Sequence, residues 1–162
     1  AFLAVAAPVT DFPATAGTFQ PQPGGKSDIL IVKLAPSGQL SAATYLGGSE
    51  AEWAEGVGVD AAGNLYLSGF TSSPNFPLTG GAGPSGGNDL LAVTLSPNLS
   101  RLLFSRRLGG TGTDDGRTVA VSSSTFVVAG TSDSPNWPVS AAAHPSRSGG
   151  TDGVIAAFTR TP

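Results

Sequence analysis

The sequence predicts an all-β fold built from repeated four-stranded antiparallel units, and three observations support this prediction. Gly (23 residues) and Pro (13 residues) are frequent in the 162-residue chain, as expected for short strands joined by tight turns. No ten-residue segment shows a helical periodicity of apolar residues. Several landmarks recur in one order at a period of roughly 60 residues. Four strands in such a period are typical of a propeller blade, so we predict a partial β-propeller of about two and a half blades and ten strands.

The repeat is clearest at a Gly-Gly pair that precedes an aspartate. Asp28, Asp89 and Asp152 open the equivalent segments DILIVKL, DLLAVTL and DGVIAAFT. The tripeptide LGG at 46–48 returns at 108–110. An aromatic residue followed by proline also recurs, in DFP, NFP and NWP. These aromatic-proline positions are Phe12, Pro13, Phe76, Pro77, Trp137 and Pro138.

The second unit shows the four strands most completely. Residues 56–60 alternate between apolar and small residues, and an Ala-Ala-Gly-Asn turn leads into residues 65–70. The continuous apolar run 89–95 suits a strand buried on both faces. Residues 101–108 are more polar and suit the outer edge. We therefore expect the alternating strand to line the centre of the propeller.

The first and third units are each predicted to lack one strand. Residues 2–6 match residues 65–69, so the first unit lacks its innermost strand, whereas residues 154–159 match the buried run, so the third lacks its outer strand. Because the chain has no Met, we expect it to be a piece of something longer. The predicted division is an incomplete blade 1 at 1–48, blade 2 at 49–110 and an incomplete blade 3 at 111–162.

The composition excludes several functional classes. Charged residues make up only 12% of the chain and the net charge is −3, so the basic face of a nucleic-acid-binding protein is missing. The absence of Cys excludes disulfides, thiolate metal sites and cysteine nucleophiles. No stretch approaches the ~20 apolar residues of a membrane span.

Acidic side chains in two Gly-rich segments are the candidate metal ligands. Carboxylates spaced closely in such a loop could hold Ca²⁺ through oxygen atoms. The spacing of an EF-hand is absent, which favours solvated loops, and we expect no other cofactor. We expect the aspartates that open the buried strands to accept backbone N–H bonds from the preceding Gly-Gly turn. The acidic candidates are Glu50, Glu52, Glu55, Asp114 and Asp115.

The sequence predicts no catalytic residues. His144 is the only histidine and stands in a segment that reads as a surface loop, so a Ser-His-Asp system is not indicated. The Gly-Gly pairs are not followed by the helix that a phosphate-binding loop requires, so nucleotide binding is not indicated. The aromatic rings before proline are interpreted as structural plugs between blades, with a ring of aromatics that stacks on a sugar as the alternative. The protein is therefore predicted not to be an enzyme.

The motifs YLGGS, GVGVDAAGNLYLSGFTSSPNFPLT and GGNDLLAVTLSPN together resemble the bacterial SBBP-type β-propeller repeats. The resemblance extends over nearly the whole chain, although SSST in the third unit replaces the family's Gly-Asn turn. It implies a large, exported, multi-blade protein of bacteria, outside the cell or at its surface, usually with no known catalytic activity. It supplies no catalytic residues.

Repeat and resemblance together predict a non-enzymatic extracellular scaffold, adhesion or protein-interaction module. Its expected partners are other propeller blades or copies of itself, through the strand edges at residues 1–7 and 152–159. One alternative is a carbohydrate-binding or carbohydrate-processing propeller with a glycan as ligand. Another is a strand-exchanging subunit of an extracellular fibre, in which the oligomer itself is the functional form.

Overall fold

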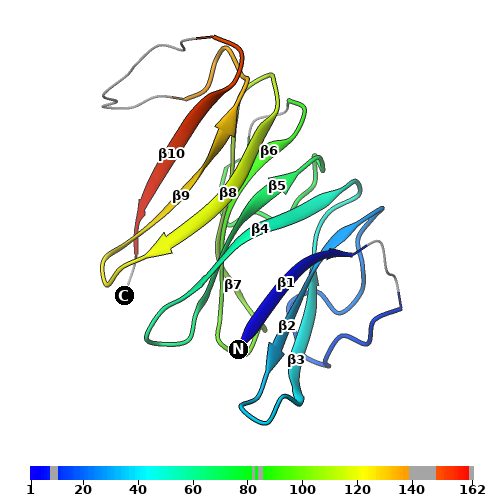
Figure 1. Cartoon of the computed structure of the whole chain (residues 1–162). Helices are drawn as coiled ribbons and strands as arrows, with labels where there is room; N and C mark the ends of the chain where they lie inside the picture. Colours follow the sequence, from blue (N-terminus) through cyan, green and yellow to red (C-terminus); the bar gives the residue numbers. More distant parts are fainter. Residues whose placement is uncertain (8–10, 82, 84–85, 139–148, 161–162) are drawn as a thin grey trace.

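The computed structural model describes residues 1–7, 11–81, 83, 86–138 and 149–160, and these residues form an all-β structure (Figure 1). Within them, ten antiparallel strands make three sheets that follow one another along the molecule. No helix in these ranges could cross a membrane. The predicted class, a partial propeller of antiparallel sheets, is confirmed.

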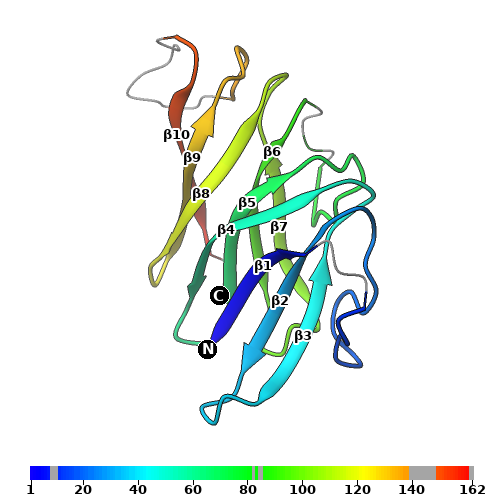
Figure 2. The ribbon, with the colours of Figure 1, turned by 45° about the vertical axis from the view of Figure 1, so that its right-hand side comes forward.

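The three sheets follow the order of the chain, and neighbouring strands within each are connected in sequence (Figure 2). The first sheet contains β1 (Phe2–Ala7), β2 (Asp28–Leu34) and β3 (Leu40–Leu46). The second contains β4 (Glu52–Val59), β5 (Leu65–Thr71), β6 (Asp89–Leu95) and β7 (Leu102–Leu108). The third contains β8 (Asp114–Val121), β9 (Thr125–Ser132) and β10 (Asp152–Thr159). β6 is buried along its whole length, as its continuous apolar sequence predicts.

The strand register shows that the three sequence units also correspond in structure. Asp89 pairs with Thr71, and Asp152 pairs with Ser132. Asp28 pairs with Ala7, which places Phe2 in the position of Tyr66. The sequence match of residues 2–6 with 65–69 is therefore wrong by one residue. The apolar residues of this strand are too uniform to fix the register, which the pairing with β2 determines.

The hydrophobic core lies between neighbouring sheets. Between the first and second sheets, buried aliphatic residues of β2 meet those of β5 and β6. Between the second and third sheets, aromatic rings dominate: Tyr66, Phe104, Phe126 and Phe158 pack with ring centroids 5.0–5.3 Å apart. The central sheet thus contributes one face to each core, as a blade of a propeller does.

The innermost strands begin earlier than the sequence predicted. β4 starts at Glu52 and β8 at Asp114, so four of the supposed loop carboxylates belong to strands. A register shift in each strand, between Ala54 and Gly56 and between Gly116 and Thr118, explains the error. Because a bulge interrupts the period-two alternation, the sequence pattern indicates a strand only for the residues after the bulge.

Candidate functional site

The same polar arrangement occurs twice, where one sheet ends and the next begins. We call each a blade junction: it joins a Leu-Gly-Gly at the end of an outer strand to the carboxylate that opens the next inner strand. The first junction contains Gly47, Gly48 and Glu52, and the second contains Gly109, Gly110 and Asp114.

In the first junction the carboxylate of Glu52 fixes the chain between the sheets. It accepts a hydrogen bond from the backbone N–H of Gly48 at 2.9 Å and from the hydroxyl of Thr71 at 2.5 Å. Next to it, the side-chain oxygen of Asn75 accepts the N–H of Ser49 at 2.9 Å. A buried acid and an amide therefore hold the Gly-rich connection, beside the isolated backbone bridge between Ser27 and Ala51.

The second junction repeats these bonds with a shorter acid. Asp114 accepts the N–H of Gly110 at 2.9 Å and the hydroxyls of Ser134, at 2.7 Å, and Ser132. Asn136 accepts the N–H of Thr111 at 2.9 Å. The sequence makes Glu52 and Asp114 candidate metal ligands. In the structure, their carboxylates accept hydrogen bonds from backbone and hydroxyl groups of their own junctions.

The aspartates that open β2 and β6 are buried at these junctions, in different surroundings. Asp28 Oδ2 accepts the N–H of Gly24 at 2.6 Å, a bond of the predicted kind, and the side-chain amide of Gln20 at 3.1 Å. Asp89 Oδ2 instead lies 3.5 Å from Arg107 Nη1. Asp152 holds the equivalent position in β10, opposite Ser132.

Burial controls the ionisation of both aspartates. Burial raises the pKa of Asp28, although the N–H groups of Gly24 and Gly25 and the amide of Gln20 act against the rise. Burial also raises the pKa of Asp89, to about 6; the charge of Arg107 opposes this rise and that of Asp114 adds to it.

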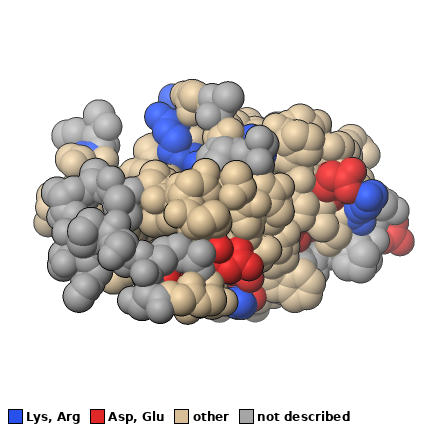
Figure 3. Space-filling model, turned by 90° about the horizontal axis from the view of Figure 1, so that it is seen from above, with Lys and Arg blue, Asp and Glu red and all other residues tan. Residues whose placement is uncertain are grey.

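The remaining acidic candidates form ion pairs on the surface. Glu50 pairs with Lys26 at 2.5 Å, while Glu55 and Asp115 pair with Arg117 at 3.1 and 3.2 Å. In the described ranges, no three His, Cys, Asp or Glu side chains assemble into a group that could hold a metal. Figure 3 shows that charged side chains form small groups on a face that is mostly uncharged.

The aromatic residues before proline pack on the cores to different extents. Phe76 is only 3% exposed and lies in the core between the first and second sheets. Trp137 is half-buried against the second core, and Phe12 packs on the outer face of the first sheet. Pro77 is half-buried, and Pro13 and Pro138 are exposed. His144 lies outside the described residues.

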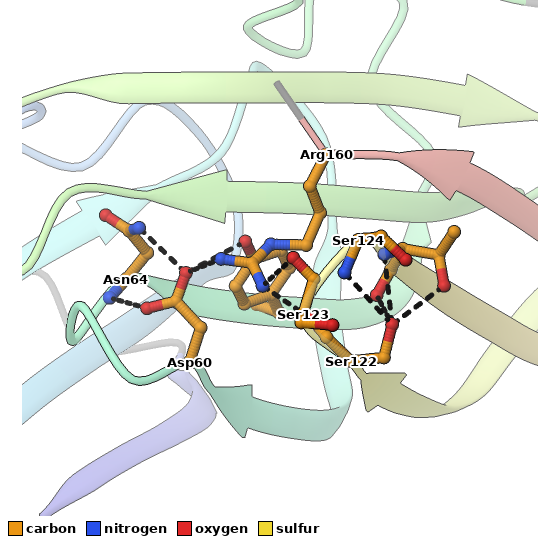
Figure 4. Close-up of polar contacts among 8 residues, drawn as sticks. Asp60, Asn64, Ser122, Ser123, Ser124 and Arg160 are labelled. Atoms are coloured by element: carbon orange, nitrogen blue, oxygen red, sulfur yellow. Dashed lines mark hydrogen bonds and ion pairs between the residues drawn. The ribbon is translucent and has the colours of Figure 1, made fainter. Parts of the chain in front are cut away.

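An ion pair that the sequence did not reveal links the second and third sheets at their other end (Figure 4). Arg160, just after β10, forms it with Asp60, just after β4. The carboxylate of Asp60 also accepts the N–H of Asn64 at 2.9 Å and the hydroxyl of Tyr66 at 3.1 Å. Arg160 donates further to the carbonyl oxygen of Ser123 at 3.1 Å.

Hydrogen bonds and the ion pair together favour the charged form of Asp60. Burial alone would raise the pKa of Asp60, but the bonds from Asn64 and Tyr66 and the charge of Arg160 lower it. The Asp-Ala-Ala-Gly-Asn turn indicates the bond between Asp60 and Asn64. No local pattern could indicate Arg160, which stands about a hundred residues away.

A polar hollow of about 280 Å³ opens where the first sheet faces the turn after β6. It is lined by small and hydroxyl-bearing residues together with Lys33 and Asn98. Lys33 Nζ donates to the carbonyl oxygen of Pro97 at 2.7 Å, so the only ammonium group in the lining is already engaged. The lining contains no aromatic ring on which a sugar could stack.

No protein-family model and no curated protein matches this chain. The resemblance to SBBP-type repeats therefore stays a hypothesis that rests on the motifs quoted above.

Proposed function

We propose that this chain is a non-enzymatic extracellular scaffold or adhesion module, whose end blades are completed by further blades or by neighbouring subunits. The observation that carries the proposal is the exposed face of the third sheet. At the equivalent positions of the second sheet, the same face is buried by the next blade.

The strand register makes this comparison residue by residue. Ile155 and Ala92 each stand three residues after the aspartate that opens their strand, and they pair with Ala129 and Ser68 respectively. Ala92 is fully buried against the third sheet, whereas Ile155 is 73% exposed. An exposed isoleucine at a position where the repeat buries its side chain marks a surface for a further blade.

Both end sheets also present a strand edge. In the described part of the chain, β10 pairs with β9 alone and β1 pairs with β2 alone. Leu3 on β1 is 53% exposed. Such edges accept a strand from another chain or segment by β-augmentation. In a fibre, copies of this chain would supply those strands to one another.

The contacts of the acidic side chains support a role without catalysis. The four buried junction acids accept bonds from backbone, hydroxyl or amide groups or face an arginine, and the other three acids, Glu50, Glu55 and Asp115, pair with lysine or arginine. Carboxylates arranged in this way hold the repeat together. The extracellular location follows from the resemblance to exported repeats.

Carbohydrate binding is the second candidate, and one observation favours it. Trp53 is 48% exposed on β4, and Glu55, two residues further along the same strand, is also exposed. An exposed indole and an exposed carboxylate on one strand suit stacking and hydrogen bonding with a sugar. A glycan array separates the two roles: binding that Trp53→Ala abolishes supports the second, and no binding at millimolar sugar eliminates it.

Light scattering on the purified chain tests the first proposal. We expect a mass above the 16.0 kDa of one chain that decreases on dilution. The variant Ile155→Lys should weaken this association because it places a charge on the exposed face. The matched control is Leu103→Lys, at an exposed leucine on the outer strand of the central sheet, which should leave the mass unchanged. A wild-type monomer whose mass is independent of concentration would contradict the proposal.

A further inference from the structure

Two carboxylates converge over a glycine at each blade junction. A Cβ atom on Gly47 would lie within 2.5 Å of both Asp28 Oδ1 and Glu52 Oε2. These oxygens are therefore no more than about 5 Å apart, a distance at which two negative charges in a protein interior repel strongly. Only glycine leaves room for both acids at this position.

The second junction has the same geometry. A Cβ atom on Gly109 would lie within 2.7 Å of both Asp89 Oδ1 and Asp114 Oδ2. Because the close approach of two acids recurs at equivalent positions of the repeat, it is a feature of both junctions and not of one loop alone.

One oxygen of each pair has no hydrogen-bond partner. Asp28 and Asp89 are 1% and 2% exposed, and their Oδ1 atoms are fully buried without a donor. The facing acids differ, because both oxygens of Glu52 and both of Asp114 accept hydrogen bonds. A buried carboxylate oxygen without a donor is strongly unfavourable, so the two aspartates need a proton or a cation at that atom.

We propose that each blade junction is a proton-binding site: Asp28 and Asp89 are protonated on Oδ1 and donate to the carboxylates of Glu52 and Asp114. The proton comes from solvent on folding, and it turns a pair of repelling charges into a carboxyl–carboxylate hydrogen bond. The aspartates carry the proton because their Oδ1 atoms have no donor, whereas both oxygens of each facing carboxylate already accept a hydrogen bond, which stabilises the charged form. The raised pKa of both aspartates agrees with this assignment.

The charged groups around the first pair, Asp28 and Glu52, do not neutralise it. Lys26 is exposed and bonds to Glu50. Tyr45, whose place in the repeat is that of Arg107, donates its hydroxyl to the carbonyl of Phe12 instead. Among the described residues, no basic group forms an ion pair with Asp28 or Glu52, so a proton compensates the pair.

Around the second pair, basic charge is present but insufficient. Arg107 lies 3.5 Å from Asp89 Oδ2 and compensates one of the two acids. Asp115, the residue after Asp114 on β8, is compensated separately, because its side chain accepts a hydrogen bond from Asn88 and pairs with Arg117. One proton on Asp89 then leaves the junction neutral with Arg107 and Asp114 charged.

The proposal fixes the direction of the pH dependence. An acid whose pKa is higher in the folded than in the unfolded state binds more protons when folded, so its contribution to stability is complete at low pH and is lost as the pH rises. For these aspartates the loss runs from about pH 4, the unfolded value, to about pH 6, the folded value of Asp89.

Urea unfolding of the full chain between pH 4.5 and pH 7.5 tests the proposal. We expect the folding equilibrium constant of the wild type to fall on the order of tenfold to a hundredfold as the pH rises. Because an asparagine amide imitates a protonated carboxyl group, Asp28→Asn and Asp89→Asn should each reduce this dependence, and the double variant should remove it. The control Glu50→Gln, at an exposed ion pair, should retain it. A wild-type stability that is constant or rises over this range would overturn the proposal.

Two further measurements remove the remaining alternatives. Calcium chloride and EDTA are added separately to the wild type at pH 7.5: stabilisation by Ca²⁺ that Asp28→Asn or Asp89→Asn abolishes would replace the proton by a cation. If the variants fail to fold, carbon-13 NMR of the wild-type carboxyl groups decides. The pKa of Asp28 and that of Asp89 should both lie above the ordinary aspartate value, and ionisation of both at pH 4.5 would overturn the proposal.

Discussion

The two blade junctions share their hydrogen bonds and differ in how their charges are compensated. In the first, Asp28 faces the neutral amide of Gln20, and the sheets are linked at their other end by Lys33 and a carbonyl oxygen. In the second, Asp89 faces Arg107, and the other end carries the ion pair of Asp60 with Arg160. The repeat therefore conserves the groups that hold the connection and varies the groups that neutralise it.

The two junctions are therefore stabilised by different interactions. The first depends mainly on apolar packing, in which Phe76 is buried among aliphatic residues. The second lies beside an aromatic cluster and contains the ion pair of Asp89 with Arg107, while the ion pair of Asp60 with Arg160 joins the same two sheets at their other end. Breaking a buried ion pair leaves an uncompensated charge, so the second junction should be more sensitive to charge substitutions and the first to loss of volume.

The largest effect is expected at the aromatic plug of the first junction. Phe76→Ala should reduce the free energy of unfolding by ~3–5 kcal/mol, the range for truncating a core aromatic residue. Trp137→Ala, at the equivalent half-buried position, should cost about 1–3 kcal/mol because less of its surface leaves water on folding. Urea unfolding of both variants measures the difference. A larger loss for Trp137→Ala would reverse the comparison.

The next largest effect is expected at Arg107, a positive charge that the first junction lacks. Arg107→Gln should reduce the free energy of unfolding at pH 7 by about 3 kcal/mol, because ionised Asp89 loses its counter-charge. The loss should be smaller at pH 4.5, where Asp89 is protonated. Arg106→Gln, at the neighbouring and more exposed arginine, is the control and should cost less than about 1 kcal/mol. Equal losses for the two variants would show that Arg107 contributes no buried charge.

The smallest effect is expected at the ion pair of Asp60 and Arg160. Arg160→Gln should cost about 1–3 kcal/mol at pH 7, as for a hydrogen bond to a charged group. Because the pKa of Asp60 is lowered in the folded protein, its contribution is present above pH ~4 and is lost as the pH falls further. Thermal unfolding between pH 2 and pH 5 should therefore show a shallower loss of stability in the variant. An unchanged acid limb would mean that this pair does not stabilise the charged carboxylate.

The sequence predicted the fold from patterns that are local and repeated. The Gly-Gly-Asp segments, the apolar run of β6 and the order of landmarks each depend on a few neighbouring residues, which is why the strands could be located. The starts of β4 and β8 were missed because a bulge interrupts the alternation. The partners of Asp28 and of Asp60 could not be predicted, since Glu52 and Arg160 approach them only after the sheets have packed.

The amide exchange rates of Gly48 and Gly110 test most directly that one junction structure occurs twice. Each N–H donates to a buried carboxylate, that of Glu52 or that of Asp114. We predict that both amides are protected as strongly as strand amides, and that Glu52→Ala exposes Gly48 to rapid exchange while Gly110 remains protected. Rapid exchange of both amides in the wild type, at the rate of a surface loop, would contradict the account.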